Sequence, residues 1–363
     1  MPWVLGRLHG PRTSDQAGAS RAVITRGSNA GLTCLMVLIE SDPDLVLEST
    51  LSSRVIWIQE RLNHMTRPSL LSRLAAGEVL VSDGAWGTFL QARGLPAGEA
   101  PELWNVEHPE VVSEIAVAYL SAGADMIETN SFGGNRVRLA SHGLAERAAE
   151  LSEAAARISR AAAGEDHYVL GSMGPTGAIL ALGDVSEDTI AEAFAEQARA
   201  LDRGGVDVLC LETFSALDEA LIAVRAARSV SSLPIACTFT FESGGSEPRT
   251  MMGHTPEEVA EALWEAGVDI LGTNCGQGIA GMIEIVRAMR RVVSDRPILV
   301  HANAGLPTMQ GGRPVWPDTP EYTASLVPKL LAAGASIVGG CCGTTPDHIR
   351  AIRRAVDAWR AHR

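Results

Sequence analysis

Three cysteines stand where a metal ion could be bound. Cys341 and Cys342 are adjacent in a glycine-rich segment, residues 339–346, that directly follows an apolar run, and Cys275 follows an earlier run in an equivalent position. Three thiolates that converge on one point suit Zn²⁺, whose catalytic sites keep three protein ligands and leave a fourth position for water or substrate. These residues therefore predict a catalytic zinc site held by Cys275, Cys341 and Cys342.

A zinc ion held by three thiolates favours one kind of chemistry. Such an ion deprotonates a substrate thiol near neutral pH, and three anionic sulfurs leave electron density on the bound sulfur. Alkylation of a substrate thiol is the reaction that this arrangement suits. The alternatives are that these cysteines are small buried residues, or that the adjacent pair forms a strained, reducible disulfide. We interpret the remaining cysteines, Cys34, Cys210 and Cys237, as packing residues.

Polar residues after other apolar runs could hold a substrate. Asp83 (in Asp-Gly-Ala-Trp-Gly-Thr) and Glu212 (in Leu-Glu-Thr-Phe) could each receive an ammonium group, although either could instead cap a helix or brace a loop. Glu128 sits similarly but is not selected as a substrate ligand. Asn303 could lend its amide oxygen to the metal when substrate is absent, or could be a turn residue before Ala-Gly.

The elements that must position these residues form a repeating pattern. From about residue 70 onward, helical stretches alternate with short apolar runs, which is typical of βα units around a parallel sheet. The eight runs are residues 79–82, 125–128, 168–171, 207–211, 235–239, 269–272, 298–301 and 336–338. Eight such units predict a (β/α)₈ TIM barrel, in which the active site lies at the C-terminal ends of the strands.

A short sequence motif marks the connections from helix to strand. Glycine and a small apolar residue precede Asp125, Asp207, Asp269 and Ser336, which open the second, fourth, sixth and eighth runs. Glycine accepts the left-handed conformation that ends a helix, so the phrase predicts where each helix stops.

The N-terminal segment differs from the remainder of the chain. Residues 1–64 lack this strand and helix rhythm, so we leave them as an unassigned extension, disordered or absent from the natural chain, and assign the barrel to residues 65–363. Met65 would then be the natural start.

Composition excludes several classes of partner. A net charge of −13 and the lack of a basic stripe argue against nucleic acid as a partner. No apolar run approaches the ~20 residues that a membrane span needs, and no export signal is recognisable. Six cysteines in 363 residues are too sparse for a disulfide scaffold, so we expect a cytoplasmic protein. The glycine-rich loop could alternatively cradle phosphate, as in a barrel lyase or isomerase, but phosphate recognition needs no paired thiols.

Together, the motifs resemble the homocysteine S-methyltransferases, which include betaine-homocysteine methyltransferase and the homocysteine-binding module of cobalamin-dependent methionine synthase. The resemblance spans about residues 70 to 355. It rests on residues 83–88, 129–132, 174–177, 212–214, 274–275, 303–305 and 339–344. It implies that the three cysteines bind zinc, that Asp83 and Glu212 hold the amino group of homocysteine, and that Asn303 can occupy the metal when homocysteine is absent.

The resemblance also implies the reaction, which is methyl transfer to the homocysteine thiol to form methionine, but leaves the donor open. S-methylmethionine or betaine would want an aromatic surface, for which Trp86 is best placed and Trp104 and Phe132 are further candidates. A separate methyl-corrinoid protein is the other donor. The chain could also be a subunit that presents homocysteine to such a partner, and homo-oligomerisation stays open.

Overall fold

The computed structural model describes residues 21–29, 32–40, 67–180, 183, 185–242, 247–311 and 313–362. It divides into two units, residues 1–66 and 67–363, which are considered separately. In the first unit, β1 (Arg21–Asn29) and β2 (Leu32–Glu40) pair antiparallel as a hairpin. This hairpin differs from the sequence expectation, which assigned no elements to residues 1–64, and Met65 lies outside the described residues. All candidate site residues belong to the second unit.

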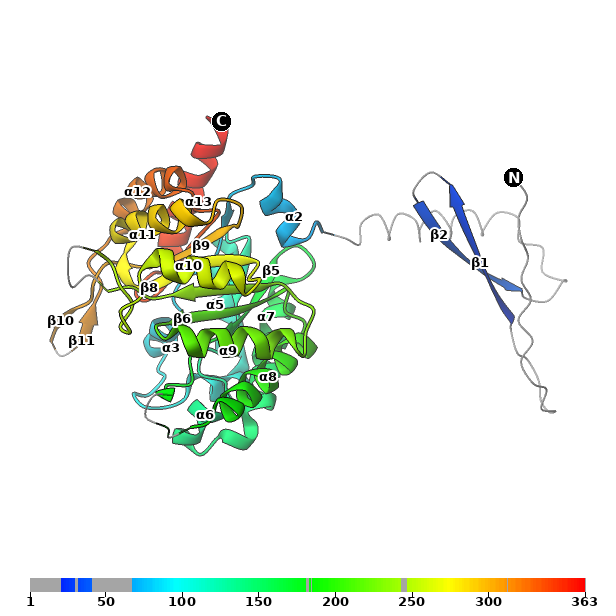
Figure 1. Ribbon diagram of the computed structural model, residues 1–363, viewed down its shortest axis with the longest axis horizontal. Helices are drawn as coiled ribbons and strands as arrows, with labels where there is room; N and C mark the ends of the chain where they lie inside the picture. Colours follow the sequence, from blue (N-terminus) through cyan, green and yellow to red (C-terminus); the bar gives the residue numbers. More distant parts are fainter. Residues whose placement is uncertain are drawn as a thin grey trace. The chain divides into compact units, whose positions relative to one another are not determined.

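Eight parallel strands form the sheet of the second unit (Figure 1). In the order in which they pair, they are β3 (Leu80–Val81), β12 (Ile337–Gly340), β9 (Ile298–Asn303), β8 (Ile270–Gly278), β7 (Ile235–Phe239), β6 (Val208–Phe214), β5 (Tyr168–Met173) and β4 (Met126–Glu128). The two ends of this order meet, because the Asp125 N–H beside β4 donates to the Val81 carbonyl of β3 at 2.7 Å. The predicted (β/α)₈ TIM barrel is confirmed, and each predicted run overlaps one strand.

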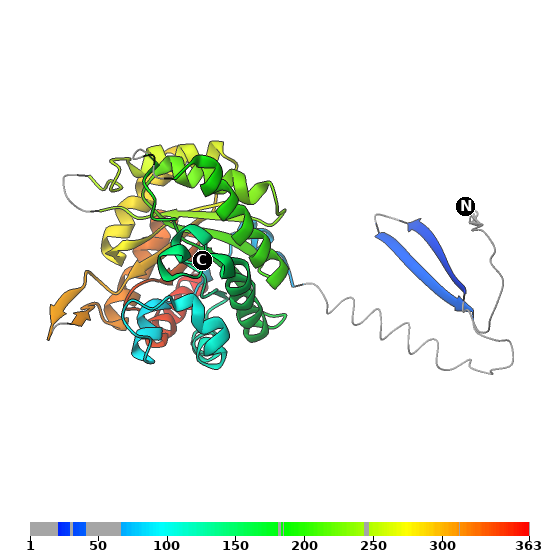
Figure 2. The same ribbon diagram turned by 90° about the horizontal axis from the view of Figure 1, so that it is seen from below.

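Helices surround the barrel, as the view in Figure 2 shows. The longer ones are α5 (Pro109–Ser121), α7 (Ala148–Ala163), α8 (Glu187–Gly204), α9 (Leu217–Arg228), α10 (Pro256–Glu265), α11 (Ile279–Val292), α12 (Pro320–Ala333) and α13 (Pro346–Ala361). Shorter elements are α2 (Leu70–Ala75), α3 (Gly87–Ala92), η1 (Pro101–Leu103), α4 (Trp104–Glu107), α6 (Arg136–Leu139), η2 (Ala140–His142), η3 (Ala145–Arg147) and the hairpin β10 (Thr308–Gln310) and β11 (Arg313–Val315). No helix in the described part of the chain has the length and apolar character to span a membrane.

Local sequence explains where individual helices begin and end. At the start of α10, the Thr255 hydroxyl accepts from the Glu258 N–H at 3.2 Å, and the Glu258 carboxylate accepts from the Thr255 N–H at 2.8 Å. This reciprocal pair satisfies two backbone donors that the first helical turn leaves free. At the end of α8, Gly205 adopts φ of +92°, which is the left-handed cap that the recurring glycine predicted.

The core has two layers because strand side chains alternate between the two faces of the sheet. Residues such as Leu80, Leu170 and Ile270 fill the barrel interior with Cys210. The alternate strand residues, Cys237 among them, pack against the surrounding helices. Both of these cysteines are fully buried, which agrees with their interpretation as packing residues.

Three aspartates brace the N-terminal end of the barrel. Asp125, Asp207 and Asp269 each accept from a backbone N–H of the preceding strand, at 2.8, 2.7 and 2.9 Å respectively. Each also forms an ion pair with arginine: Asp125 with Arg353, Asp207 with Arg67 and Arg160, and Asp269 with Arg228. The aspartates of the recurring sequence phrase therefore link β3 to β4, β5 to β6 and β7 to β8.

The fourth copy of this arrangement lacks its carboxylate. Ser336 occupies the position before β12, and its N–H donates to the Ile298 carbonyl at 2.8 Å, as the aspartate N–H groups do in their copies. Arg290 of α11 corresponds to the pairing arginines, and it donates to the Gly334 carbonyl at 2.8 Å. In the described residues, Arg290 has no carboxylate within ion-pair distance.

Candidate active site

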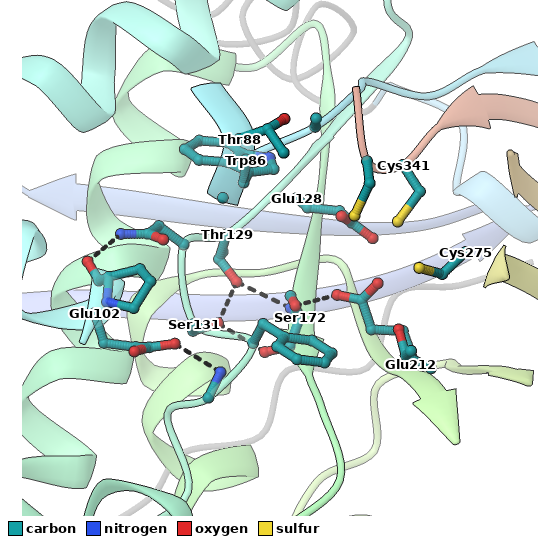
Figure 3. A pocket seen from close by; sticks show the side chains of 18 of the residues that line it. Trp86, Thr88, Glu102, Glu128, Thr129, Ser131, Ser172, Glu212, Cys275 and Cys341 are labelled. Atoms are coloured by element: carbon teal, nitrogen blue, oxygen red, sulfur yellow. Dashed lines mark hydrogen bonds between the residues drawn. The ribbon is translucent and has the colours of Figure 1, made fainter. Parts of the chain in front are cut away.

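A cavity of about 540 Å³ opens at the C-terminal ends of the strands. Its walls come from the ends of β4, β5, β6, β8, β9 and β12, and from the loops that follow β3 and β4. Figure 3 shows the thiols of Cys275 and Cys341 and the carboxylates of Glu128 and Glu212 pointing into the same space. This is the end of the barrel at which active sites of this fold lie.

The three predicted metal ligands come together in this cavity. The sulfur atoms of Cys275, Cys341 and Cys342 all lie within 4.8 Å of one another. Sulfur ligands bound at about 2.3 Å in tetrahedral geometry are about 3.8 Å apart, so the spacing fits one zinc ion. Hydrogen bonds from the other two thiols lower the pKa of Cys275, and the same bonds raise the pKa of Cys341 and of Cys342. The protein alone thus already favours a thiolate at Cys275.

A bulge in β8 turns Cys275 toward the cavity. The pairing of β8 with β9 shifts between Asn274 and Gly278, and Cys275 adopts φ of +56° in this interval. Gly276 follows with φ of +62°, and a Cβ there would lie 2.7 Å from the Phe241 carbonyl. A bulge of this kind redirects one side chain, which here is the thiol.

The adjacent cysteines are positioned by the departure of the backbone from β12. The Cys341 N–H still donates to the Ala302 carbonyl of β9 at 2.7 Å, and the Cys342 carbonyl accepts from the Ala304 N–H at 3.0 Å. The Thr344 hydroxyl then donates to the Cys341 carbonyl at 2.7 Å. A Cβ on Gly340 would lie 2.2 Å from that hydroxyl, so the tight turn requires the glycine predicted from the sequence.

Asp83 lies behind the cavity wall and does not line it. Its carboxylate is fully buried and accepts from the Trp86 indole N–H and from the Glu128 backbone N–H, both at 2.8 Å. Burial, followed by the charge of Glu128, raises the pKa of Asp83 to about 7. In this position Asp83 fixes two residues that do line the cavity, Trp86 and Glu128.

Two buried carboxylates and a histidine form the polar end of the cavity. One ligand atom each from Glu128, Glu212 and His301 lies within 4.8 Å of the others, and His301 Nδ1 is 3.4 Å from Glu128 Oε1. Burial raises the pKa of Glu128 to about 8 and raises that of Glu212 well above its usual value. No lysine or arginine forms an ion pair with either carboxylate in the described part of the chain.

The sequence analysis selected Glu212 as a candidate substrate ligand, but it selected neither Glu128 nor His301. All three residues line the cavity. The available signal was their place at the ends of β4, β6 and β9, where chemistry is expected in this fold.

Asn303 lies close to the thiols. Its side chain is buried and hydrogen-bonds to Cys275, which contributes to the lowered pKa of that cysteine. Its Oδ1 atom has no hydrogen-bond partner among the described residues. A buried amide oxygen without a partner is costly, so this atom suits a metal or a ligand proton beside the thiols.

The three aromatic candidates divide between the cavity and its surroundings. Trp86 and Phe132 line the cavity, whereas Trp104 does not. The Trp104 indole N–H donates to Glu99 at 2.8 Å, outside the group of thiols and buried carboxylates. Arg138 already lies 5.0 Å from the centroid of the Phe132 ring. Trp86 is therefore the candidate that we retain for contact with a donor.

Comparison with known proteins agrees with this geometry. The family model described as homocysteine S-methyltransferase matches residues 80–356. The methionine synthases of Mycobacterium leprae and Mycobacterium tuberculosis are each 35% identical over 311 residues, which cover 81% of this chain. The match covers 25% and 26% of those proteins, so the chain spans about a quarter of their length.

A solved structure extends the comparison to the fold. The metallated form of the homocysteine methyltransferase MmuM from Escherichia coli superposes with a TM-score of 0.64 at 26% identity, covering 78% of this chain and 98% of that one. Its oxidised form gives a TM-score of 0.62 at 27% identity, with 76% and 95% covered. Since the family model matches most of the barrel, the chain belongs to the homocysteine S-methyltransferase family.

Proposed function

We propose that this protein transfers a methyl group to the thiol of homocysteine and so forms methionine. The observation that carries the proposal is that one cavity holds three convergent thiols and, beside them, a pair of buried carboxylates that form no ion pair with a lysine or arginine of the described residues. Homocysteine has a thiol at one end and an ammonium group at the other. The substrate thiol would lie at the three cysteine thiols, and its ammonium group would lie at the carboxylates.

The carboxylates are proposed to bind the substrate ammonium group. Glu128 and Glu212 line the cavity, and a bound ammonium would supply the positive charge that their surroundings lack. Asp83 would position Glu128, because it accepts from the Glu128 N–H and from the Trp86 indole N–H. We therefore revise the expectation for Asp83 from a direct contact to a supporting one.

The thiols of Cys275, Cys341 and Cys342 are proposed to hold Zn²⁺. When bound, zinc acts as a Lewis acid that lowers the pKa of a coordinated thiol and leaves it nucleophilic. The residues of the chain orient the substrate: the carboxylates anchor its ammonium group, and Asn303 offers its free amide oxygen beside the thiols. Fixing both ends of homocysteine aims its sulfur at the methyl donor.

We infer that the donor is a small cation such as S-methylmethionine or betaine. Trp86 lines the cavity together with Glu99 and Glu102, and aromatic and acidic groups attract an onium methyl donor. A cavity of about 540 Å³ accommodates homocysteine and such a donor together. The matched test is Trp86→Leu against Trp104→Phe, where only the first should raise KM for the donor.

A second candidate is that the chain presents homocysteine to a separate methyl-corrinoid protein. The observation that favours it is the match to about a quarter of the methionine synthases. In that case methylcobalamin, free or bound to a protein, would support turnover and the small cations would not.

One experiment separates these readings. Zinc content and methionine formation would be measured on the wild type, on Cys342→Ser and on Cys237→Ala, a control whose thiol packs outside the barrel interior. S-methylmethionine, betaine and methylcobalamin would be supplied separately. Stoichiometric zinc with turnover from one donor, both lost only in Cys342→Ser, would support the proposal. A folded wild type that binds no zinc would contradict it.

We place the reaction in the cytoplasm, where a reducing environment keeps three neighbouring thiols from forming disulfides. A homo-oligomer stays a prediction, which sedimentation equilibrium would test directly.

A further inference from the structure

One buried amide lies between the two ends of the site. Asn274, the residue before Cys275 in β8, is fully buried. Its Oδ1 accepts from the Thr213 N–H at 2.9 Å and from the Thr238 hydroxyl at 2.7 Å. Its Nδ2 donates to the Thr213 hydroxyl at 2.7 Å and to Glu212 Oε2 at 3.4 Å. Both acceptor and both donor positions of the amide are thus occupied.

The two residues that flank this amide have unusual backbone conformations. Thr213 and Cys275, with φ of +63° and +56°, are the non-glycine residues of positive φ in the described part of the chain. Thr213 directly follows Glu212, and Cys275 carries one of the three thiols. Such conformations persist only where the surrounding structure determines them, and they cluster at functional sites. The Asn274 side chain holds the first, and its backbone leads into the second.

We propose that Asn274 is a positioning residue that fixes the separation between the ammonium-binding carboxylate of Glu212 and the sulfur of Cys275. This inference rests on the proposed function. The amide bonds to Glu212 directly and to both the N–H and the hydroxyl of Thr213, so it holds the end of β6 against the end of β8. The span of a bound homocysteine would be set by that separation.

Only asparagine meets these requirements at this position. Aspartate would keep both accepted bonds, but it would face the Glu212 carboxylate with a second acceptor. Alanine would leave the Thr213 N–H and the Thr238 hydroxyl without a partner. Glutamine carries one more methylene than the fully buried site holds.

The test uses a ligand pair that differs at one end only. Homocysteine and 4-mercaptobutyrate share the thiol and the carboxylate, but 4-mercaptobutyrate lacks the amino group. Dissociation constants for both would be measured by calorimetry on the zinc-loaded wild type, Asn274→Ala and Thr238→Val, with zinc content determined in parallel. Thr238→Val is the matched control, because it removes one bond to the same amide and leaves its bonds to Thr213 and Glu212 intact.

We expect the wild type to prefer homocysteine by at least about tenfold, as a charged hydrogen-bonded contact would provide. In Asn274→Ala this preference should fall about tenfold, while the dissociation constant for 4-mercaptobutyrate changes less than about threefold. Thr238→Val should keep the preference even though its Tm falls.

Two results would overturn the inference. A preference unchanged in Asn274→Ala would show that the amide does not position Glu212, and an equal loss for both ligands would show a merely structural role. If Asn274→Ala does not fold, Thr213→Ala removes the hydroxyl that the amide donates to, and it should lower the preference about threefold. A wild type that does not distinguish the two ligands would instead contradict the proposed function itself.

Discussion

The two ends of the barrel use carboxylates in opposite ways. At the N-terminal end, Asp125, Asp207 and Asp269 each have an arginine and a backbone N–H as partners. At the C-terminal end, Glu128 and Glu212 are buried with neither arginine nor lysine in an ion pair, within the described residues, and burial raises the pKa of both. The aspartates are paired with cations within the fold, whereas we propose that the two glutamates receive theirs from the substrate.

Backbone conformation shows the same contrast. The left-handed positions at the N-terminal end are glycines such as Gly205 and Gly334, which adopt positive φ without steric cost. The C-terminal end places Thr213 and Cys275 in that region, at a cost of order 1 to 3 kcal/mol each. Among the described residues, the strained non-glycine positions thus lie at the end that carries the proposed chemistry.

The largest expected effect is on activity, and it comes from removing a carboxylate at the C-terminal end of the barrel. Glu212→Gln should lower kcat/KM for homocysteine about a hundredfold, because an amide cannot replace the charge that faces the ammonium group. The Tm should not fall, since burying an amide costs less than burying an unpaired carboxylate. Steady-state kinetics and thermal unfolding on the same preparation check both points, and unchanged kinetics would refute the assignment of Glu212.

Removing a carboxylate at the N-terminal end should have the opposite result, a loss of stability without a loss of activity. Asp207→Asn leaves Arg67 and Arg160 without their carboxylate, and it should lower the free energy of unfolding by about 2 kcal/mol. The value of kcat/KM should stay within about twofold of the wild type, because the change lies at the opposite end of the strands. Urea unfolding measures the first quantity. A large kinetic effect would show that the two ends are not separate.

The pH dependence of stability should come from the C-terminal end. The folded-state pKa of Glu128 is raised to about 8, so its proton is retained in the folded protein after the unfolded chain has lost it. Ligand-free stability should therefore be greatest below about pH 4.3 for this group and fall by about 1.4 kcal/mol per pH unit up to about pH 8.

The control for this prediction is Glu128→Gln, which should reduce the slope over that range by the share of one group, while Asp83 and Glu212, whose pKa values are also raised, keep theirs. Homocysteine should stabilise the wild type more strongly as the pH rises toward 8, because its ammonium group binds the ionised carboxylates. Thermal unfolding at a series of pH values measures both trends. A wild-type slope that persists unchanged in Glu128→Gln would assign the effect to another group.

The smallest expected effect is a gain in stability from adding a fourth carboxylate at the N-terminal end. Ser336→Asp should supply the missing fourth carboxylate to Arg290 and to the Ile298 N–H, and a cavity beside Ser336 and Arg290 leaves room for it. We expect a gain of about 1 kcal/mol in the free energy of unfolding and no change in activity. A loss of stability would mean that Ser336 is not equivalent to the three aspartates.

The sequence predicted the barrel and the thiols because both leave local signals. The apolar runs marked all eight strands, and glycines flanking Cys341 and Cys342 marked a turn at a strand end. The sequence carries no local signal that tells a buried side chain from one that lines the cavity. Asp83 and Glu128 both lie at strand ends, yet only the structure shows that Glu128 lines the cavity while Asp83 accepts from the Glu128 N–H.

Other features depended on contacts between distant segments. The left-handed conformation of Cys275 arises from the shifted pairing of β8 with β9, which cannot be read from a residue that rarely adopts it. The strands β6 and β8 also extend past their predicted ends, to Phe214 and Gly278, because Phe214 pairs with Phe239 and Gly278 pairs with Asn303 after a shift of register in each strand. The hairpin of β1 and β2 had no recognised pattern.

The missing fourth carboxylate has a mechanical consequence. At the N-terminal end of the barrel, the aspartates join the strands in pairs: β3 with β4, β5 with β6, and β7 with β8. The pair of β9 and β12 has Ser336 at this position, so it lacks the hydrogen bond to a carboxylate. Cys275 extends from β8 and Cys341 follows β12, on either side of β9. A metal bound by these thiols would join the two neighbours of β9 at the other end of the barrel, so it would stabilise the barrel as well as complete the site.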